Sequence, residues 1–151
     1  MILYLFDEEP EVALAHGRDF LTEGVEDVVF CYLRFASGKI AHMHLSWLDP
    51  HKMRRLTVVG RDKMAVFDDM ELERKVTVYD KGYEQDAGSW GEYITRSGDI
   101  WSPRIPNREP LRLECEHFLR LVNGEGDKGK VARDGAMVVR ALERLTDSLR
   151  G

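Results

Sequence analysis

Alternating apolar and polar residues over 25–48 predict a β-hairpin with two distinguishable faces. On either side of the turn signal at Ser37-Gly38, successive side chains point to opposite sides of the strands. One face is apolar, while the other is mixed and carries Tyr32, Ile40, His42 and His44. A mixed face of this kind is not a typical wetted surface. We therefore expect helices to cover one side of this sheet and a partner subunit to cover the other.

Further strands are predicted by short apolar runs that turn residues separate. We expect a helical turn at Ile2–Phe6 and then strands at about 11–16, 25–36, 39–48, 53–60, 63–68 and 74–81. The short spacing between them favours antiparallel pairing. Residues 83–110 contain many glycines and prolines, so we interpret them as a long loop excursion with little regular structure.

Two helices are predicted to close the chain. The first, over 111–122, follows Pro110 and stops before Gly124. A polar loop is expected at 124–133, with Asp134 capping the second helix. Strands followed by helices predict an α+β fold, in which helices pack on one face of a mainly antiparallel open sheet and the other face is available for oligomerisation. The 151 residues are expected to form a single domain.

Charge and composition exclude several classes of function. A net charge of −5 disfavours nucleic acid as a partner. No apolar run approaches the ~18 residues that a membrane span needs, and the first residues lack the features of a signal peptide. We therefore expect a cytoplasmic protein without a membrane partner. The two cysteines, Cys31 and Cys115, are expected to be buried thiols.

Motifs for cofactor and metal chemistry have little support. The chain has no early βαβ unit that could carry a dinucleotide fingerprint, and the complete Walker motif does not occur. His42-x-His44 supplies two metal ligands, which is too few for a closed site. Glu114-x-x-His117 has the spacing of di-iron bundle proteins but no second copy. We predict no catalytic residue, no metal site and no cofactor site in this chain.

The segment 98–109 is the strongest candidate for ligand binding. It is expected to form a short loop that leads into a helix N-terminus and carries Asp99, Trp101, Arg104, Asn107 and Arg108. Arginine suits a phosphate or carboxylate, and tryptophan suits the face of a sugar. The alternative stays open that this is a rigid loop packed on the sheet edge, with Trp101 as its anchor.

Several segments, in this order, resemble the C-terminal domain of the Gfo/Idh/MocA family, the relatives of glucose-fructose oxidoreductase and inositol dehydrogenase. They are Gly38–Pro50, Leu56–Gly60, Val66–Asp69, Val78–Asp80, Glu109–Phe118 and Asp134-Gly135. The resemblance implies an enzyme in which a Rossmann domain binds NAD or NADP, while an open sheet shapes the sugar site and builds the oligomer interface. The family's Glu-Lys-Pro and Asp-x-x-x-His segments have no match in this chain, so no catalytic residue is carried over.

Two hypotheses for function follow. In the first, the chain is a fragment: the substrate-binding and oligomerisation domain of an NAD(P)-dependent sugar or nucleotide-sugar dehydrogenase, not catalytic alone. Its partners would be a second copy of itself, a separate Rossmann domain and a small-molecule sugar. In the second, it is a stand-alone, non-enzymatic dimeric module that binds a carbohydrate or small anion. The DNA upstream of Met1 would distinguish the two.

Overall fold

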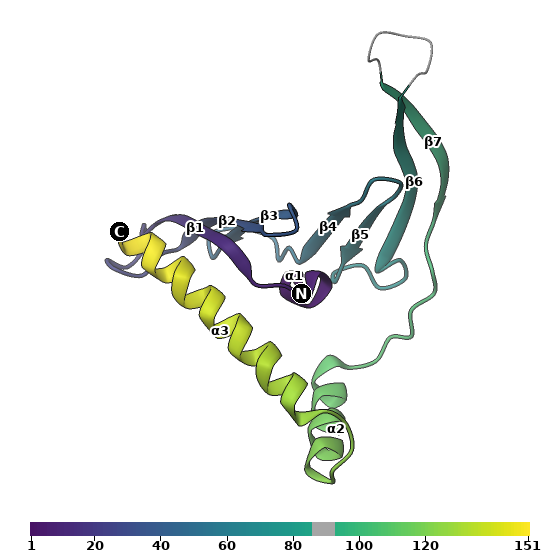
Figure 1. The fold of residues 1–151 in the computed structure, drawn as a ribbon. Helices are drawn as coiled ribbons and strands as arrows, with labels where there is room; N and C mark the ends of the chain where they lie inside the picture. The colour runs from purple at the N-terminus through teal and green to yellow at the C-terminus, as the bar shows by residue number, and fades with distance from the viewer. Residues whose placement is uncertain (86–92) are drawn as a thin grey trace. The chain divides into compact units, whose positions relative to one another are not determined.

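The chain forms two units, each built on an antiparallel sheet (Figure 1). The computed structural model describes residues 1–85 and 93–151. The first unit consists of Met1–Pro50 with Glu114–Gly151, and the second of His51–Leu113. The two sheets and the helices confirm the predicted α+β class with open antiparallel sheets. That all 151 residues act as a single domain stays a prediction.

The first unit contains the predicted hairpin, extended by one strand. After α1 (Ile2–Phe6), three strands pair antiparallel in chain order: β1 (Pro10–Arg18), β2 (Val28–Phe35) and β3 (Ile40–Ser46). The turn between β2 and β3 has Gly38 at a φ of 82°, which glycine adopts without strain. Tyr32 lies opposite His42 in the register, so the mixed face predicted from the sequence is confirmed.

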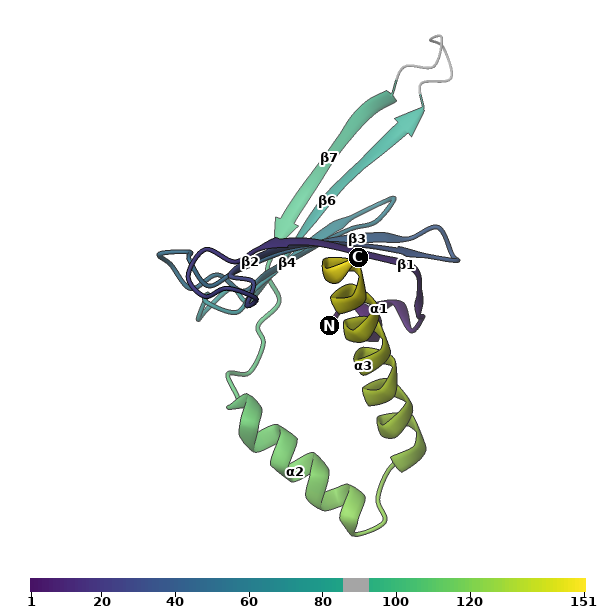
Figure 2. The ribbon, with the colours of Figure 1, turned by 90° about the vertical axis from the view of Figure 1, so that its left-hand side faces the viewer.

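The C-terminal part of helix α3 (Lys128–Arg150) packs on the other face of this sheet, along β1 (Figure 2). The amide of Ala15 on β1 donates to the Ser148 hydroxyl of α3 at 3.0 Å. Phe35 is 1% exposed and meets the Phe6 ring edge-on, with centroids 4.9 Å apart. The buried apolar residues come from α1, the sheet and α3: Leu3, Ala15, Cys31, Leu33, Phe35, Ala141 and Leu145. The core of the first unit therefore lies between the sheet and α3.

The predicted start of α3 is wrong by about two turns. Asp127, not Asp134, caps the helix, and its carboxylate accepts from the Lys130 amide at 2.9 Å. Most of the polar stretch 124–133 is therefore helical. Asp134 lies inside the first turns and pairs instead with the Lys130 side chain, 3.0 Å away and one turn back. Asp127 and Asp134, seven residues apart, are both suitable N-cap residues, and the helix begins at the earlier one.

Helix α2 (Pro110–Val122) has almost the predicted bounds, but none of its residues is buried. Cys115 is accordingly exposed, so the prediction of a buried thiol is wrong at this position. It is confirmed at Cys31, where burial raises the pKa of the thiol. The apolar side of α2 is exposed at Leu111, Phe118, Leu119 and Val122.

The second unit is a four-stranded antiparallel sheet whose strands pair in chain order. They are β4 (Arg55–Val59), β5 (Met64–Asp68), β6 (Val76–Gln85) and β7 (Tyr93–Trp101). The first three confirm predicted strands. The expected lack of regular structure over 83–110 is wrong for the end of β6 and for β7, and right for 102–109. Residues 86–92 of that excursion lie outside the described ones.

A β-bulge between β6 and β7 interrupts the alternation of inward and outward side chains, so the sequence pattern did not predict this hairpin. Gly98 and Asp99 of β7 together oppose Asp80 of β6. A Cβ on Gly98 would lie 2.5 Å from a carboxylate oxygen of Asp80, so only glycine leaves room for that side chain. The Arg96 guanidinium lies 2.8 Å from the Asp80 carboxylate and donates to the Asp62 carbonyl at 2.8 Å. The bulge thus ties the hairpin to the β4–β5 turn.

Candidate functional site

The face of the first sheet opposite α3 carries all four residues predicted as an oligomer interface. The strand register arranges its side chains in rows, such as His16–Phe30–His44 and Leu14–Tyr32–His42. Four apolar or aromatic members are well exposed, at 62% for Ile40, 57% for Phe30, 48% for Leu14 and 38% for Tyr32. We call this surface the outer face; its residues are Val12, Leu14, His16, Arg18, Val28, Phe30, Tyr32, Arg34, Ile40, His42, His44 and Ser46.

The centre of the outer face is flat and aromatic. The Phe30 and His44 rings stack with centroids 4.6 Å apart and planes 5° from parallel. At the β1–β2 end, a shallow hollow of about 430 Å³ is lined by His16, Arg18, Phe20 and Phe30, among others. A flat surface with apolar bodies and polar ring edges suits packing against a second flat surface better than enclosure of a small ligand.

The permanently charged side chains of the outer face are positive. Arg18 and Arg34 are its permanent charges, and the twelve residues that the register places on this face include no carboxylate, although the exposed Glu11 lies at the β1 bulge beside Val12. The nearby Glu8 is engaged at the β2–β3 turn, where it accepts from the Ser37 amide at 2.9 Å and pairs with Lys39 at 3.5 Å. Hydrogen bonding from Ser37 holds the pKa of Glu8 below its usual value.

Asp27 shapes the end of the outer face and was missed by the sequence reasoning. It is 7% exposed, and its carboxylate accepts from the amides of Phe20 and Leu21, both at 2.7 Å. Its own amide donates to Arg18, and its carbonyl accepts from Trp47. Asp27 therefore fixes the β1–β2 connection against β3. An acidic residue just ahead of an apolar strand is the only sequence signal, and it is a weak one.

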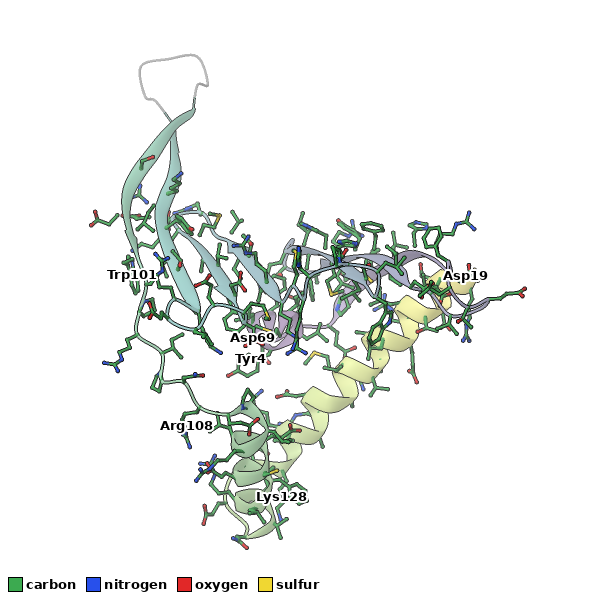
Figure 3. All side chains as sticks on the ribbon, turned by 180° about the vertical axis from the view of Figure 1, so that it is seen from behind. Tyr4, Asp19, Asp69, Trp101, Arg108 and Lys128 are labelled. Atoms are coloured by element: carbon green, nitrogen blue, oxygen red, sulfur yellow. The ribbon has the colours of Figure 1, made fainter. Side chains whose placement is uncertain are left out.

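The predicted ligand-binding residues do not form one loop. Asp99 and Trp101 belong to β7, whereas Arg104, Asn107 and Arg108 lie in the irregular segment 102–109. All five are exposed. Figure 3 shows Trp101 beside the end of β7 and Arg108 farther along the chain, just before α2. The two side chains are apart, so a ligand that meets both must be elongated.

The N-terminus of α2 does not offer free amides to a ligand in the way the sequence suggested. The Glu109 carboxylate accepts from the Leu111 amide at 3.1 Å and from the Arg112 amide at 2.5 Å. A carboxylate in that position repels an anion and satisfies the donors that would hold it. An anionic ligand of this segment would therefore depend on the arginine side chains.

The glycine-rich segment 124–131 does not have the surroundings of a phosphate-binding loop. Residues 124–131 contain the glycine spacing of nucleotide-binding loops, but they follow a helix, not a strand, and Val131 stands where a phosphate-binding loop needs serine or threonine. The amides of Gly124 and Glu125 already donate to carbonyls at the end of α2, at 3.1 and 2.8 Å. Asp127 caps the next helix. The segment is a turn between two helices, and its glycines serve the helix end.

Metal and membrane sites can be assessed over the same residues. In the described part of the chain, no group of three or more His, Cys, Asp and Glu side chains is placed to hold a metal ion. His42 and His44 share the outer face as a pair. Across 1–85 and 93–151, no helix is long and apolar enough to span a membrane.

Comparison with known proteins agrees with this architecture. Residues 1–66 match the sequence model of the GFO/IDH/MocA C-terminal domain. UDP-N-acetylglucosamine 3-dehydrogenase GnnA from Acidithiobacillus ferrooxidans is similar in fold in two crystal forms. The TM-scores are 0.70 and 0.71, at 20% and 17% identity over 97% of this chain. This chain spans only 44% and 42% of the length of those chains.

No curated protein matches the chain in sequence. At the identities found, the likeness to the solved dehydrogenase concerns the fold. The comparisons agree with the family resemblance seen in the sequence: residues 1–66 match the model of the GFO/IDH/MocA C-terminal domain, and 97% of the chain is similar in fold to part of a solved nucleotide-sugar dehydrogenase.

Proposed function

We propose that this chain is the substrate-binding and oligomerisation domain of an NAD(P)-dependent sugar dehydrogenase whose substrate is a nucleotide-linked sugar. The observation that carries the proposal is the outer face, an exposed apolar and aromatic sheet surface opposite the helix-covered core. The domain match over 1–66 and the fold of a UDP-N-acetylglucosamine dehydrogenase support the enzyme class. The dinucleotide would be bound outside the residues described, because their helix N-termini hold carboxylates.

The occupant of the outer face in this proposal is a second copy of the chain. Three strands that run side by side over the seven residues of β3 give a flat footprint of roughly 14 by 24 Å, or about 340 Å². A standard interface buries about 800 Å² of accessible surface per subunit. The outer face therefore supplies part of a standard interface, and the isolated chain should associate weakly unless other surfaces contribute.

Replacing Ile40 with lysine tests this assembly. Ile40 is 62% exposed in one copy, so the Ile40→Lys chain should fold normally and fail to dimerise, because the ammonium would be buried beside Arg34. Sedimentation velocity over a concentration series would measure the loss. Leu72→Lys, at a 76% exposed position of the second unit, is the matched control and should behave as wild type. A wild-type chain that stays monomeric at every concentration would refute the proposed assembly.

The substrate part of the proposal concerns Arg104, Arg108 and Trp101. Two guanidinium groups suit a sugar diphosphate, and the indole, 49% exposed, suits a ring face. We expect Arg104→Ala and Arg108→Ala each to raise KM for UDP-N-acetylglucosamine by about tenfold or more when the chain is joined to a dinucleotide-binding domain. Arg74→Ala, an exposed site elsewhere in the second unit, is the control. Unchanged KM and kcat in both variants would assign the segment to scaffolding.

A further inference from the structure

Three of the five histidines of the chain lie on the outer face: His16, His42 and His44. All three are exposed in the single copy. His16 and His44 flank Phe30 in one cross-strand row, and His42 lies in the next row beside Tyr32. The other two histidines, His51 and His117, lie outside this sheet. The face proposed to meet a second copy is therefore the place where this chain concentrates groups that change charge near neutral pH.

No group of opposite charge faces these imidazoles from the described residues of their own cross-strand rows. Strand β1 adds Arg18 and β2 adds Arg34. The exposed Glu11 of β1 lies at the bulge beside Val12, and the cross-strand rows that hold the three histidines contain no carboxylate among the described residues. An imidazolium in these rows consequently has no acidic partner within its own row.

A second copy brings the same residues and no others. In a twofold dimer both subunits present one and the same surface, so six histidines and four arginines would share the interface, and the exposed carboxylate of β1, Glu11, lies at the bulge beside Val12, outside the histidine rows. A neutral imidazole can be buried as a flat, partly apolar ring. A protonated one would carry a positive charge into a surface that already holds arginines.

We propose that assembly through the outer face is controlled by pH: the copies associate when the three histidines are neutral and separate when they are protonated. This inference rests on the proposed dimer. In the monomer an imidazolium is hydrated, whereas in the dimer it is desolvated among like charges. The monomer therefore binds protons more readily, and a fall in pH favours it. The modest footprint of the face makes association sensitive to this effect.

The test is sedimentation equilibrium of the wild-type chain at about pH 8 and about pH 5.5, at constant ionic strength. We expect the dissociation constant of the dimer to rise at least about tenfold at the lower pH. Circular dichroism at both values confirms that the subunits stay folded. A dimer of equal affinity at both pH values overturns the inference and leaves the proposed dimer standing. A monomer at both values overturns the proposed dimer itself.

Variants identify the responsible groups. The His16→Gln, His42→Gln, His44→Gln triple variant should dimerise at both pH values, because glutamine keeps a polar side chain without a titrating proton. The control is the His51→Gln, His117→Gln double variant, which should keep the wild-type response. A triple variant that still dissociates at low pH overturns the role of the histidines. Each single variant should lose part of the response, which provides the same test should the triple variant fail to fold.

Discussion

The two units of this chain differ in how much apolar surface they bury. In the first, a helix closes one face of the sheet, and side chains such as Leu33 and Phe35 are nearly inaccessible, at 3% and 1%. In the second, no apolar side chain among the described residues is fully buried, and those of β5 and β6 are half-buried. The first sheet has a buried apolar core of its own. The second is held by the hydrogen bonds between its strands and by side chains at its surface.

The second unit has a cluster of ion pairs around Asp68 and Asp69. Asp69 pairs with Arg54 and Lys75, both at 3.4 Å, and hydrogen bonding from Lys75 holds the pKa of Asp69 below its usual value. Asp68 pairs with Arg55 at 3.4 Å on the neighbouring strand. Exposed pairs contribute little to stability. Among its described residues, the second unit therefore has neither a closed core nor a strong electrostatic substitute for one, in contrast to the first unit.

Truncating one phenylalanine in each unit is the strongest way to break this comparison. Phe35→Ala leaves a cavity in the closed core and should cost about 3–5 kcal/mol of unfolding free energy. Phe67→Ala, on half-buried β5, should cost less than half as much because water already reaches the site. Urea unfolding followed by circular dichroism measures both. Equal losses would mean that the second unit has a core as closed as the first.

A pair of glycines sharpens the comparison at the level of the backbone. Gly98→Ala places a Cβ against the Asp80 carboxylate in the bulge, and we expect about 1–3 kcal/mol of destabilisation, confined to the second unit. Gly135→Ala is the control, since its Cβ would meet nothing within 4 Å inside α3 and should stabilise that helix by up to about 1 kcal/mol. Hydrogen exchange would show faster opening of β6 and β7 in the first variant alone. Unaltered exchange there would contradict a steric role for Gly98.

The same contrast explains which parts of the fold were predictable. The β2–β3 hairpin alternates strictly because one face is closed by α3, and a closed face imposes alternation on the sequence. Strand β7 has a bulge at Gly98 and no closed face, so its residues looked like a loop. Helix α3 was placed correctly but started late, because two aspartates offered similar caps and sequence alone does not rank them.

The residues of the candidate site also fall into those that the sequence predicted and those that it did not. The outer face could be predicted because Tyr32, His42 and their neighbours alternate with core residues. Asp27 and Glu109 could not, since each acts through amides that only the folded chain brings within reach. The glycine spacing in 124–131 also has no meaning without its context, which is a helix end and not a strand. Whether Arg104 and Arg108 meet a substrate stays a prediction.

The smallest expected effect concerns the two aspartates that compete to begin α3. Asp127→Ala removes the acceptor of the Lys130 amide and should cost about 1 kcal/mol, with fraying of the first turn. Asp134→Ala removes only an exposed pair with the Lys130 side chain and should cost several times less. Asp127→Asn should restore most of the loss, because an amide oxygen also caps a helix.

Thermal unfolding and amide exchange at residues 128–131 would measure these differences. Faster exchange at the helix start in Asp127→Ala, with little change in Asp134→Ala, is the expected pattern. The reverse order would mean that the helix is held from Asp134, where the sequence first suggested it begins. Because α3 closes the core of the first unit, a cap that changes only its first turn should leave the burial of Leu145 unaltered.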